Sequence, residues 1–255
     1  MTDDDALLER VADAFARLPG VEAVALGGSR AYGGTTVESD WDVALYYRAG
    51  FHPQAVRDLG WPGHLTDIGG WGPVFNGGGK LEVEGRAIDV HYRDLLLIDR
   101  IHDEAERGEY RVEPLLFHQA GLPSYILLAE LGLNRTLRGR LPDWPYPEAL
   151  RRTAPARWWS DASRTLGYAR DGHARRGRVA QTAGLLSEAA CRAAHAVLAA
   201  RAQWVTNEKR LLALAGLDID DAVTGLRPDP AVLVAAVDDV ERRLAEAVAR
   251  EGLRL

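Results

Sequence analysis

The stretch LGGSRAYGGTTVESDWDVALYY, from Leu26 to Tyr47, joins a glycine pair, a polar run and two aspartates separated by one tryptophan. Aspartate is a poor strand former, so an Asp-Trp-Asp start to an apolar strand indicates that the carboxylates serve something other than folding. Residues i and i+2 of a strand point to the same face. Asp40 and Asp42 are therefore predicted to lie side by side, with Trp41 turned the other way.

Neighbouring carboxylates repel each other and attract divalent cations. Oxygen ligands without a dedicated cage, completed by substrate phosphates, suit Mg²⁺. Asp89, in AIDVH, is a third aspartate between apolar residues on another predicted strand. If the two strands pair, Asp40, Asp42 and Asp89 (the aspartate triad) converge as in a two-metal site. Asp-x-Asp alone is common and can mark a turn; its combination with Asp89 and the upstream glycines favours the functional interpretation.

The glycines precede a short polar segment at the end of a predicted strand. Gly27 and Gly28 (the glycine turn) let the backbone approach an anion closely. Ser29 is predicted to cap a short helix whose N–H groups face phosphate, and Arg30 adds a positive charge. These four residues are the candidate nucleotide-binding segment.

Together these motifs resemble the nucleotidyltransferase superfamily that includes DNA polymerase beta. The matching pattern is Leu26-Gly27-Gly28, eleven residues, Asp40-Trp41-Asp42-Val43, and then Ile88-Asp89-Val90. The closest likeness is to the small, two-domain bacterial branch that contains the aminoglycoside and lincosamide nucleotidyltransferases. The resemblance is specific over residues 21–94 and loose over the remainder.

The resemblance implies an α+β fold, with a mixed-sheet nucleotidyltransferase domain followed by an all-helical domain. It also implies transfer of a nucleoside monophosphate, AMP from ATP, to a hydroxyl of a small cationic acceptor such as an aminoglycoside-like compound, as in antibiotic resistance. Asp40 and Asp42 would bind two Mg²⁺ ions, and pyrophosphate would be released. Asp89 would ligate the catalytic metal and take the proton from the attacking hydroxyl.

Hydrophobic periodicity and turn residues outline the elements. A helix is expected over 4–18, strands over VEAVALGG and WDVALYY, and a helical pattern from residue 93 onward. The glycine-rich segment between them is expected to contain strands at 71–75, 81–83 and 86–92, with turns at 76–79 and 84–85. The proline-rich LPDWPYP places the domain boundary after residue 140, giving domains 1–140 and 141–255.

The chain uses arginine almost everywhere, and its only lysines are Lys80 and Lys209. Lys209, within NEKR, is a candidate for a compact ammonium that contacts phosphate; the alternative is an ordinary lysine on a helix. Lys80 ends GGGK, which lacks the glycine spacing of a P-loop and is expected to be a hairpin turn.

Charge and cysteine content limit the partners and the compartment. A net charge of −6 argues against a general nucleic-acid binder, although 151–178 carries eight arginines against two aspartates. The single cysteine and an acidic start without a signal-peptide pattern predict a cytoplasmic protein. No apolar stretch reaches membrane-spanning length, so no membrane partner is expected. The sequence does not specify an oligomeric state.

Two alternatives remain open from the sequence. One is nucleotidyl transfer to a protein or RNA acceptor, as in antitoxin-like or tRNA-modifying relatives, with 151–178 holding the RNA. The other is a non-catalytic module that only binds nucleotide. The intact aspartate triad argues against the second, because mutually repelling acids are poor structural choices.

Overall fold

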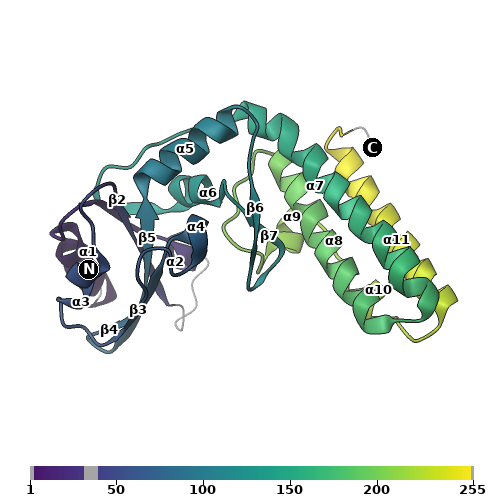
Figure 1. Cartoon of the computed structure of the whole chain (residues 1–255), viewed down its shortest axis with the longest axis horizontal. Helices are drawn as coiled ribbons and strands as arrows, with labels where there is room; N and C mark the ends of the chain where they lie inside the picture. The colour runs from purple at the N-terminus through teal and green to yellow at the C-terminus, as the bar shows by residue number, and fades with distance from the viewer. Residues whose placement is uncertain (1–2, 32–39, 254–255) are drawn as a thin grey trace. The chain divides into compact units, whose positions relative to one another are not determined.

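The computed structural model describes residues 3–31 and 40–253, apart from the side chain of Ser29 (Figure 1). It contains a mixed sheet, many helices and a helical C-terminal region, which confirms the predicted α+β class. The described residues form two compact units. The first unit comprises Met1–Asp103 and Leu127–Pro145, and the second comprises Glu104–Ile126 and Tyr146–Leu255.

The first unit is built on a six-stranded sheet of order β3-β4-β5-β2-β1-β8. Only β2 and β5 are parallel among these neighbouring pairs; the other pairs are antiparallel. Its strands are β1 (Val21–Leu26), β2 (Trp41–Tyr47), β3 (Gly63–Leu65), β4 (Gly78–Val83), β5 (Arg86–Asp94) and β8 (Arg135–Gly139). The helices that begin in it or border it are α1 (Asp3–Ala16), α2 (Gly28–Ala31), α3 (Pro53–Arg57), α4 (Gly72–Phe75), α5 (Leu95–Glu106) and α6 (Ile126–Leu133).

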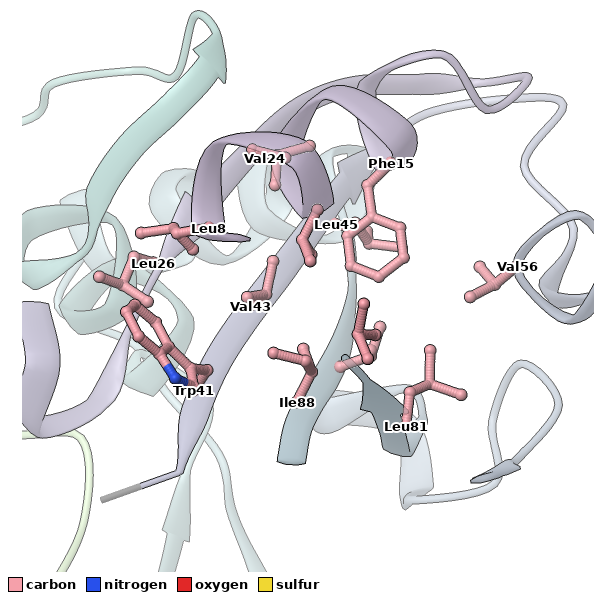
Figure 2. Close-up of a cluster of buried hydrophobic side chains, with 14 of the residues drawn as sticks. Leu8, Phe15, Val24, Leu26, Trp41, Val43, Leu45, Val56, Leu81 and Ile88 are labelled. Carbon is pink, nitrogen blue, oxygen red and sulfur yellow. The ribbon is translucent and has the colours of Figure 1, made fainter. Parts of the chain in front are cut away.

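An apolar core fills the space between one face of this sheet and helix α1 (Figure 2). Leu8 and Phe15, seven residues apart on α1, lie on one helical face and are buried. Trp41, Val43 and Leu45 alternate along β2 and join the same cluster. Because strand side chains alternate, burial of Trp41 in this core turns residue 42 to the opposite face, as predicted.

The glycine-rich segment differs from the prediction in three respects. It contains the strand β3, which the sequence pattern does not predict. Residues 72–75 form the helix α4 rather than a strand, because Pro73 has no N–H for a ladder and suits a first helical turn. Gly78 and Gly79 belong to β4 rather than to a turn. A Cβ on Gly79 would lie 1.9 Å from the carbonyl oxygen of His64, so these glycines permit close strand packing.

Strands also interrupt the region from residue 93 onward, for which a helical pattern with a few breaks is predicted. The antiparallel pair β6 (Val112–Leu115) and β7 (His118–Pro123) lies in the second unit, and β8 adds to the edge of the main sheet. The carboxylate of Glu208 accepts the backbone N–H groups of Gln119, and of Ala120 at 2.9 Å. Tertiary partners of this kind override local propensity.

Three helices of the second unit, α7, α8 and α11, pack against one another along their lengths (Figure 1). The helical elements of this unit are α7 (Glu148–Tyr168), the π-turn Ala169–His173, the 3₁₀ turn Ala174–Arg176, α8 (Val179–Ala200), α9 (Leu211–Ala215), α10 (Asp220–Thr224) and α11 (Pro230–Arg250). No helix in the described part of the chain has the length and apolar character needed to cross a bilayer.

The domain boundary predicted after residue 140 stays a prediction. The compact units differ from a single linear division, because residues 104–126, including both strands of the hairpin, pack with the later helices. The chain therefore passes between the units after residues 103, 126 and 145. Sequence composition marks the last of these passages through its prolines, but it carries no signal for the other two.

The core of the second unit contains a buried histidine. His195 is 5% exposed and stacks on Trp158 with ring centroids 4.7 Å apart. Burial, with a smaller contribution from nearby His118, lowers the pKa of His195 from 6.5 to about 3. In turn, the indole Nε1 of Trp158 donates a hydrogen bond to the hydroxyl of Tyr125 at 2.9 Å.

We expect this histidine to make the fold acid-sensitive. The unfolded chain binds the proton near pH 6.5 and the folded protein only near pH 3, so stability is complete above pH 6.5 and falls as pH decreases through this interval. The loss from pH 8 to pH 5 should be about 2 kcal/mol. Denaturant unfolding of His195→Phe should show a flatter pH dependence. The exposed-site control His64→Phe should keep the wild-type slope, and equal slopes for all three proteins would contradict the assignment.

Candidate active site

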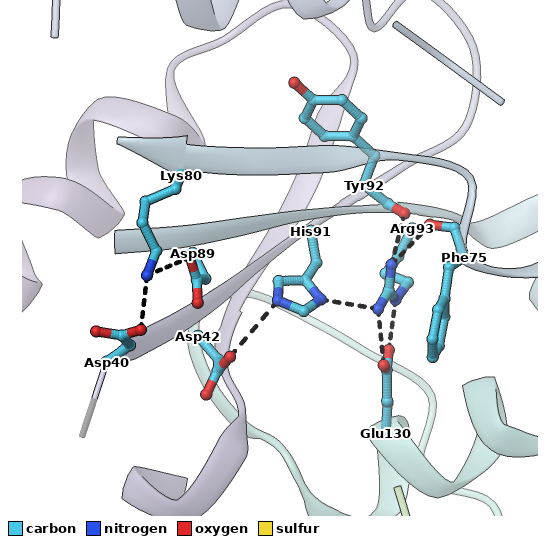
Figure 3. A network of polar contacts seen from close by, with 9 residues as sticks. All are labelled: Asp40, Asp42, Phe75, Lys80, Asp89, His91, Tyr92, Arg93 and Glu130. Atoms are coloured by element: carbon cyan, nitrogen blue, oxygen red, sulfur yellow. Dashed lines mark hydrogen bonds and ion pairs between the residues drawn. The ribbon is translucent and has the colours of Figure 1, made fainter. Parts of the chain in front are cut away.

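The aspartate triad lies on and beside the central parallel strand pair. β2 and β5 pair in a register that places Asp42 directly opposite Asp89, and Asp40 immediately precedes β2. Figure 3 shows the three carboxylates on one side of the sheet. Their side chains are partly exposed, at 45% for Asp40, 33% for Asp42 and 29% for Asp89. The strand pairing on which the sequence prediction depended is thus present.

A lysine from the next strand reaches into this group. Lys80 on β4 is the register partner of Asp89, and its Nζ lies 2.7 Å from Asp40 Oδ2 and 3.6 Å from Asp89 Oδ1 (Figure 3). The hydrogen bond to Asp40, with the charge of Asp89, raises the pKa of Lys80. The side chain is therefore an ammonium ion lying between two of the carboxylates.

Asp89 is the most enclosed member of the triad. Burial is the largest influence and raises the pKa of its carboxyl group; the Lys80 ammonium acts in the opposite direction, and Asp40 and Asp42 raise the pKa further. A carboxylate that is partly desolvated and surrounded by like charge is a stronger base than one in water. This is the electrostatic environment expected of a group that accepts a proton.

Behind the triad, the same face of β5 carries an arginine whose hydrogen-bond donors are all used. Arg93 is 1% exposed, and its guanidinium bonds to both carboxylate oxygens of Glu130 on α6 and to the carbonyl oxygens of Phe75 and Tyr92. Its fifth contact is with His91 Nδ1 at 3.0 Å. A guanidinium has five N–H donors, so every one of them is used.

The hydrogen bond from Arg93 determines which ring nitrogen of His91 carries the proton that faces the triad. Arg93 can only donate, so His91 Nδ1 must accept, and the proton of the neutral ring then lies on Nε2. Nε2 is 3.6 Å from Asp42 Oδ1, beyond a direct hydrogen bond but close enough for an electrostatic contact (Figure 3). The histidine thus presents an N–H toward Asp42 rather than a lone pair.

The glycine turn packs directly against Asp42. The backbone N–H of Gly27 donates to the carbonyl oxygen of Asp42 at 2.8 Å. Gly28 has φ +62°, and a Cβ there would lie 1.8 Å from Asp42 Oδ2. Glycine is therefore required at position 28 both for its backbone conformation and for the space that the carboxylate occupies.

The other candidate nucleotide-binding residues are placed less directly. Ser29 lies within α2 rather than at its cap, and its side chain is outside the described atoms. The Arg30 guanidinium stacks on the Trp41 ring at 4.1 Å and lies 4.0 Å from Asp4, on the core side of β2. Lys209 is exposed on the second unit, where its backbone N–H donates to Asn207 Oδ1. Their roles stay predictions.

The donor chemistry of the site suits a hard divalent cation. All three side chains of the triad offer carboxylate oxygens, the ligands that Mg²⁺ prefers. The Lys80 ammonium shows that a positive charge is accommodated between Asp40 and Asp89. Within residues 3–31 and 40–253, no three acidic, histidine or cysteine side chains are drawn together tightly enough to enclose a metal ion.

Sequence reasoning missed the two cations of this site. The glycine-rich pattern places Lys80 at a turn, although the rarity of lysine in this arginine-rich chain is a usable signal. Arg93 and Glu130 lie 37 residues apart, and neither has a local pattern that predicts a buried pair.

Comparison with known proteins adds little to the evidence that these residues give about function. No protein-family model matches the chain, and no curated protein is significantly similar to it. One similar solved structure is a nucleotidyltransferase-like protein from Exiguobacterium sibiricum 255-15, with a TM-score of 0.36 and 9% identity over 97% of this chain and 78% of that chain. A similarity of this size assigns neither family nor function, so the functional assignment depends on the site itself.

Proposed function

We propose that the protein is a Mg²⁺-dependent nucleotidyltransferase similar to DNA polymerase beta and its small bacterial relatives. The observation that carries the proposal is the parallel register of Asp42 and Asp89, with the glycine turn packed on Asp42. Carboxylates from two adjacent strands beside a glycine turn suit the joint binding of metal and polyphosphate.

Each member of the triad has a role in this proposal. Asp40 and Asp42 hold two Mg²⁺ ions with the nucleotide, and Asp89 ligates the catalytic one. The metal supplies charge stabilisation for the attacking and leaving oxygens of an in-line displacement at the α-phosphorus. Asp89 also accepts the proton of the attacking hydroxyl, because one of its carboxylate oxygens can face the metal while the other faces the nucleophile.

The co-substrate is a nucleoside triphosphate, with ATP proposed because of the sequence resemblance. The glycine turn and Ser29 hold the triphosphate, with Arg30 and Lys209 as further contacts. The acceptor is a small molecule with a hydroxyl group, of the cationic aminoglycoside-like class; this part rests on resemblance and on the acidic balance of the chain.

An acceptor screen with labelled ATP tests the proposal. Purified protein with Mg²⁺ should release pyrophosphate and attach label to one class of hydroxyl compound, and Mg²⁺ chelation should stop both. The Asp42→Asn protein serves as the matched blank for contaminating activity. Failure to bind or turn over any nucleoside triphosphate with Mg²⁺ or Mn²⁺ would refute the proposal.

Ion pairing in the arginine-rich segment favours the small acceptor over RNA. Arg151 is paired with Glu148, and Arg170 is paired with Asp238 and Glu241. These contacts reduce the positive charge available to a phosphate backbone. We therefore expect acceptor binding to vary little with salt. A loss of several-hundredfold between 50 and 200 mM salt, abolished by charge reversal of exposed Arg164 and Arg175, would identify a nucleic-acid acceptor instead.

Gly28→Ala is expected to damage the site more than the fold. The new Cβ forces the Asp42 side chain to rotate away, whereas the positive φ costs about 1–2 kcal/mol of stability. Gly60→Ala is the matched control, because φ there is +74° and no atom lies within 4 Å of the added Cβ. Both variants should lose similar stability in denaturant unfolding, but only Gly28→Ala should lose binding of Mn²⁺ with nucleotide. Wild-type binding by Gly28→Ala would contradict this geometry.

A further inference from the structure

We infer that Lys80 is the internal counter-ion of the metal site, so that the site binds divalent cations weakly alone and tightly together with a polyphosphate. The inference rests on the proposed function and adds to it a coupling between the two ligands. Its consequence is that the metal-free and nucleotide-free protein holds its carboxylates in place without recruiting a metal ion.

The geometry places the ammonium where it competes with a metal. Lys80 Nζ contacts Asp40 Oδ2 at 2.7 Å and lies 3.6 Å from Asp89 Oδ1, so it occupies the space between two proposed metal ligands. The contact follows from sheet register, since Lys80 and Asp89 are cross-strand partners on β4 and β5. A cation bound to the same oxygens must displace the ammonium or remain beside a like charge.

The Lys80 side chain can move away from the triad, unlike that of Arg93 on the same sheet face. The Lys80 side chain is 56% exposed, and within residues 3–31 and 40–253 its ion pairs are with Asp40 and Asp89 alone, so it can swing into solvent without opening the core. Arg93 is 1% exposed and uses all five of its N–H donors. Only the lysine therefore combines contact with the triad and freedom to move.

Charge balance links this movement to the nucleotide. Two divalent ions and the Lys80 ammonium would bring five positive charges to the three carboxylates of the triad. A triphosphate supplies the missing negative charge and gives the displaced ammonium a new anionic partner. Metal and polyphosphate should therefore each raise the affinity for the other, as linkage requires.

Mn²⁺ binding measured by electron paramagnetic resonance tests the coupling without requiring turnover. Without nucleotide, Lys80→Gln should bind Mn²⁺ about tenfold more tightly than the wild type, because one like charge is gone. With an α,β-methylene ATP analogue, which blocks transfer, the wild type should gain at least about tenfold in Mn²⁺ affinity and Lys80→Gln should gain much less.

Two variants separate charge from other effects. Lys80→Arg keeps the charge and should keep weak Mn²⁺ binding. Arg10→Gln removes the same charge from an exposed pair with Glu84, at the turn after β4, and should leave Mn²⁺ affinity at the wild-type value. Thermal unfolding confirms that each variant is folded.

The outcomes distinguish this inference from the function on which it rests. If the wild type binds Mn²⁺ but Lys80→Gln binds it no more tightly, or if the analogue aids both equally, the counter-ion role is wrong and the metal site stands. If neither protein binds Mn²⁺ with or without the analogue, the metal assignment fails and the inference fails with it.

Discussion

Asp42→Asn is expected to lower nucleotidyl transfer by at least about a thousandfold, since metal-ion stabilisation of a phosphoryl transition state contributes several kcal/mol. Asparagine has the same shape but lacks the negative charge that would hold the metal. Asp42 lies on β2, an inner strand of the sheet, in register with Asp89 on β5. Asp40→Asn should have an effect of the same kind, and it also removes the hydrogen-bond partner of Lys80.

The fold should survive the same substitutions. Asp42 contributes its backbone carbonyl to the glycine turn, and that contact is kept in the asparagine variant. In Asp42→Asn, removal of one of three neighbouring carboxylates relieves repulsion, so thermal stability without metal should hold or rise slightly. Asp67→Asn, at an exposed ion pair with Arg57, is the matched control and should keep full turnover. Near-normal turnover by Asp42→Asn or Asp40→Asn would overturn the two-metal assignment.

Asp89→Asn separates metal ligation from proton transfer. If Asp89 only ligates metal, the variant should need more Mg²⁺, and high Mg²⁺ should restore its rate. If Asp89 also accepts the hydroxyl proton, the asparagine cannot replace it, and a loss of about a hundred- to ten-thousandfold should persist at every Mg²⁺ concentration. We expect the second result, because one carboxylate oxygen can face the metal while the other faces the nucleophile.

Turnover measured across a wide Mg²⁺ series decides between these roles, with nucleotide binding measured separately for each protein. Asp40→Asn provides the comparison, since a pure ligand should respond more strongly to added metal. Complete recovery of Asp89→Asn at high Mg²⁺ would remove the base role. The proton would then pass to water or to another acid.

Local pattern predicted much of the first unit. The alternation of Trp41, Val43 and Leu45 with polar or small residues defined β2 and directed the aspartates away from the core. Charge repulsion between Asp40 and Asp42 then marked them as candidate metal ligands. In the second unit, local pattern was wrong because of long-range contacts. Residues 112–123 form a hairpin held in part by Glu208, which is about ninety residues distant along the chain.

The sequence by itself determined the α+β class and the face on which the Asp40 and Asp42 carboxylates lie, because strand periodicity acts over a few residues. Only the tertiary structure decided which side chains meet there. Sheet register set Asp42 against Asp89 and Lys80 against Asp89, and burial joined Arg93 to Glu130. Register and burial depend on how distant strands and helices pack. A shift of the β4 register by one residue would have turned Lys80 to the other face.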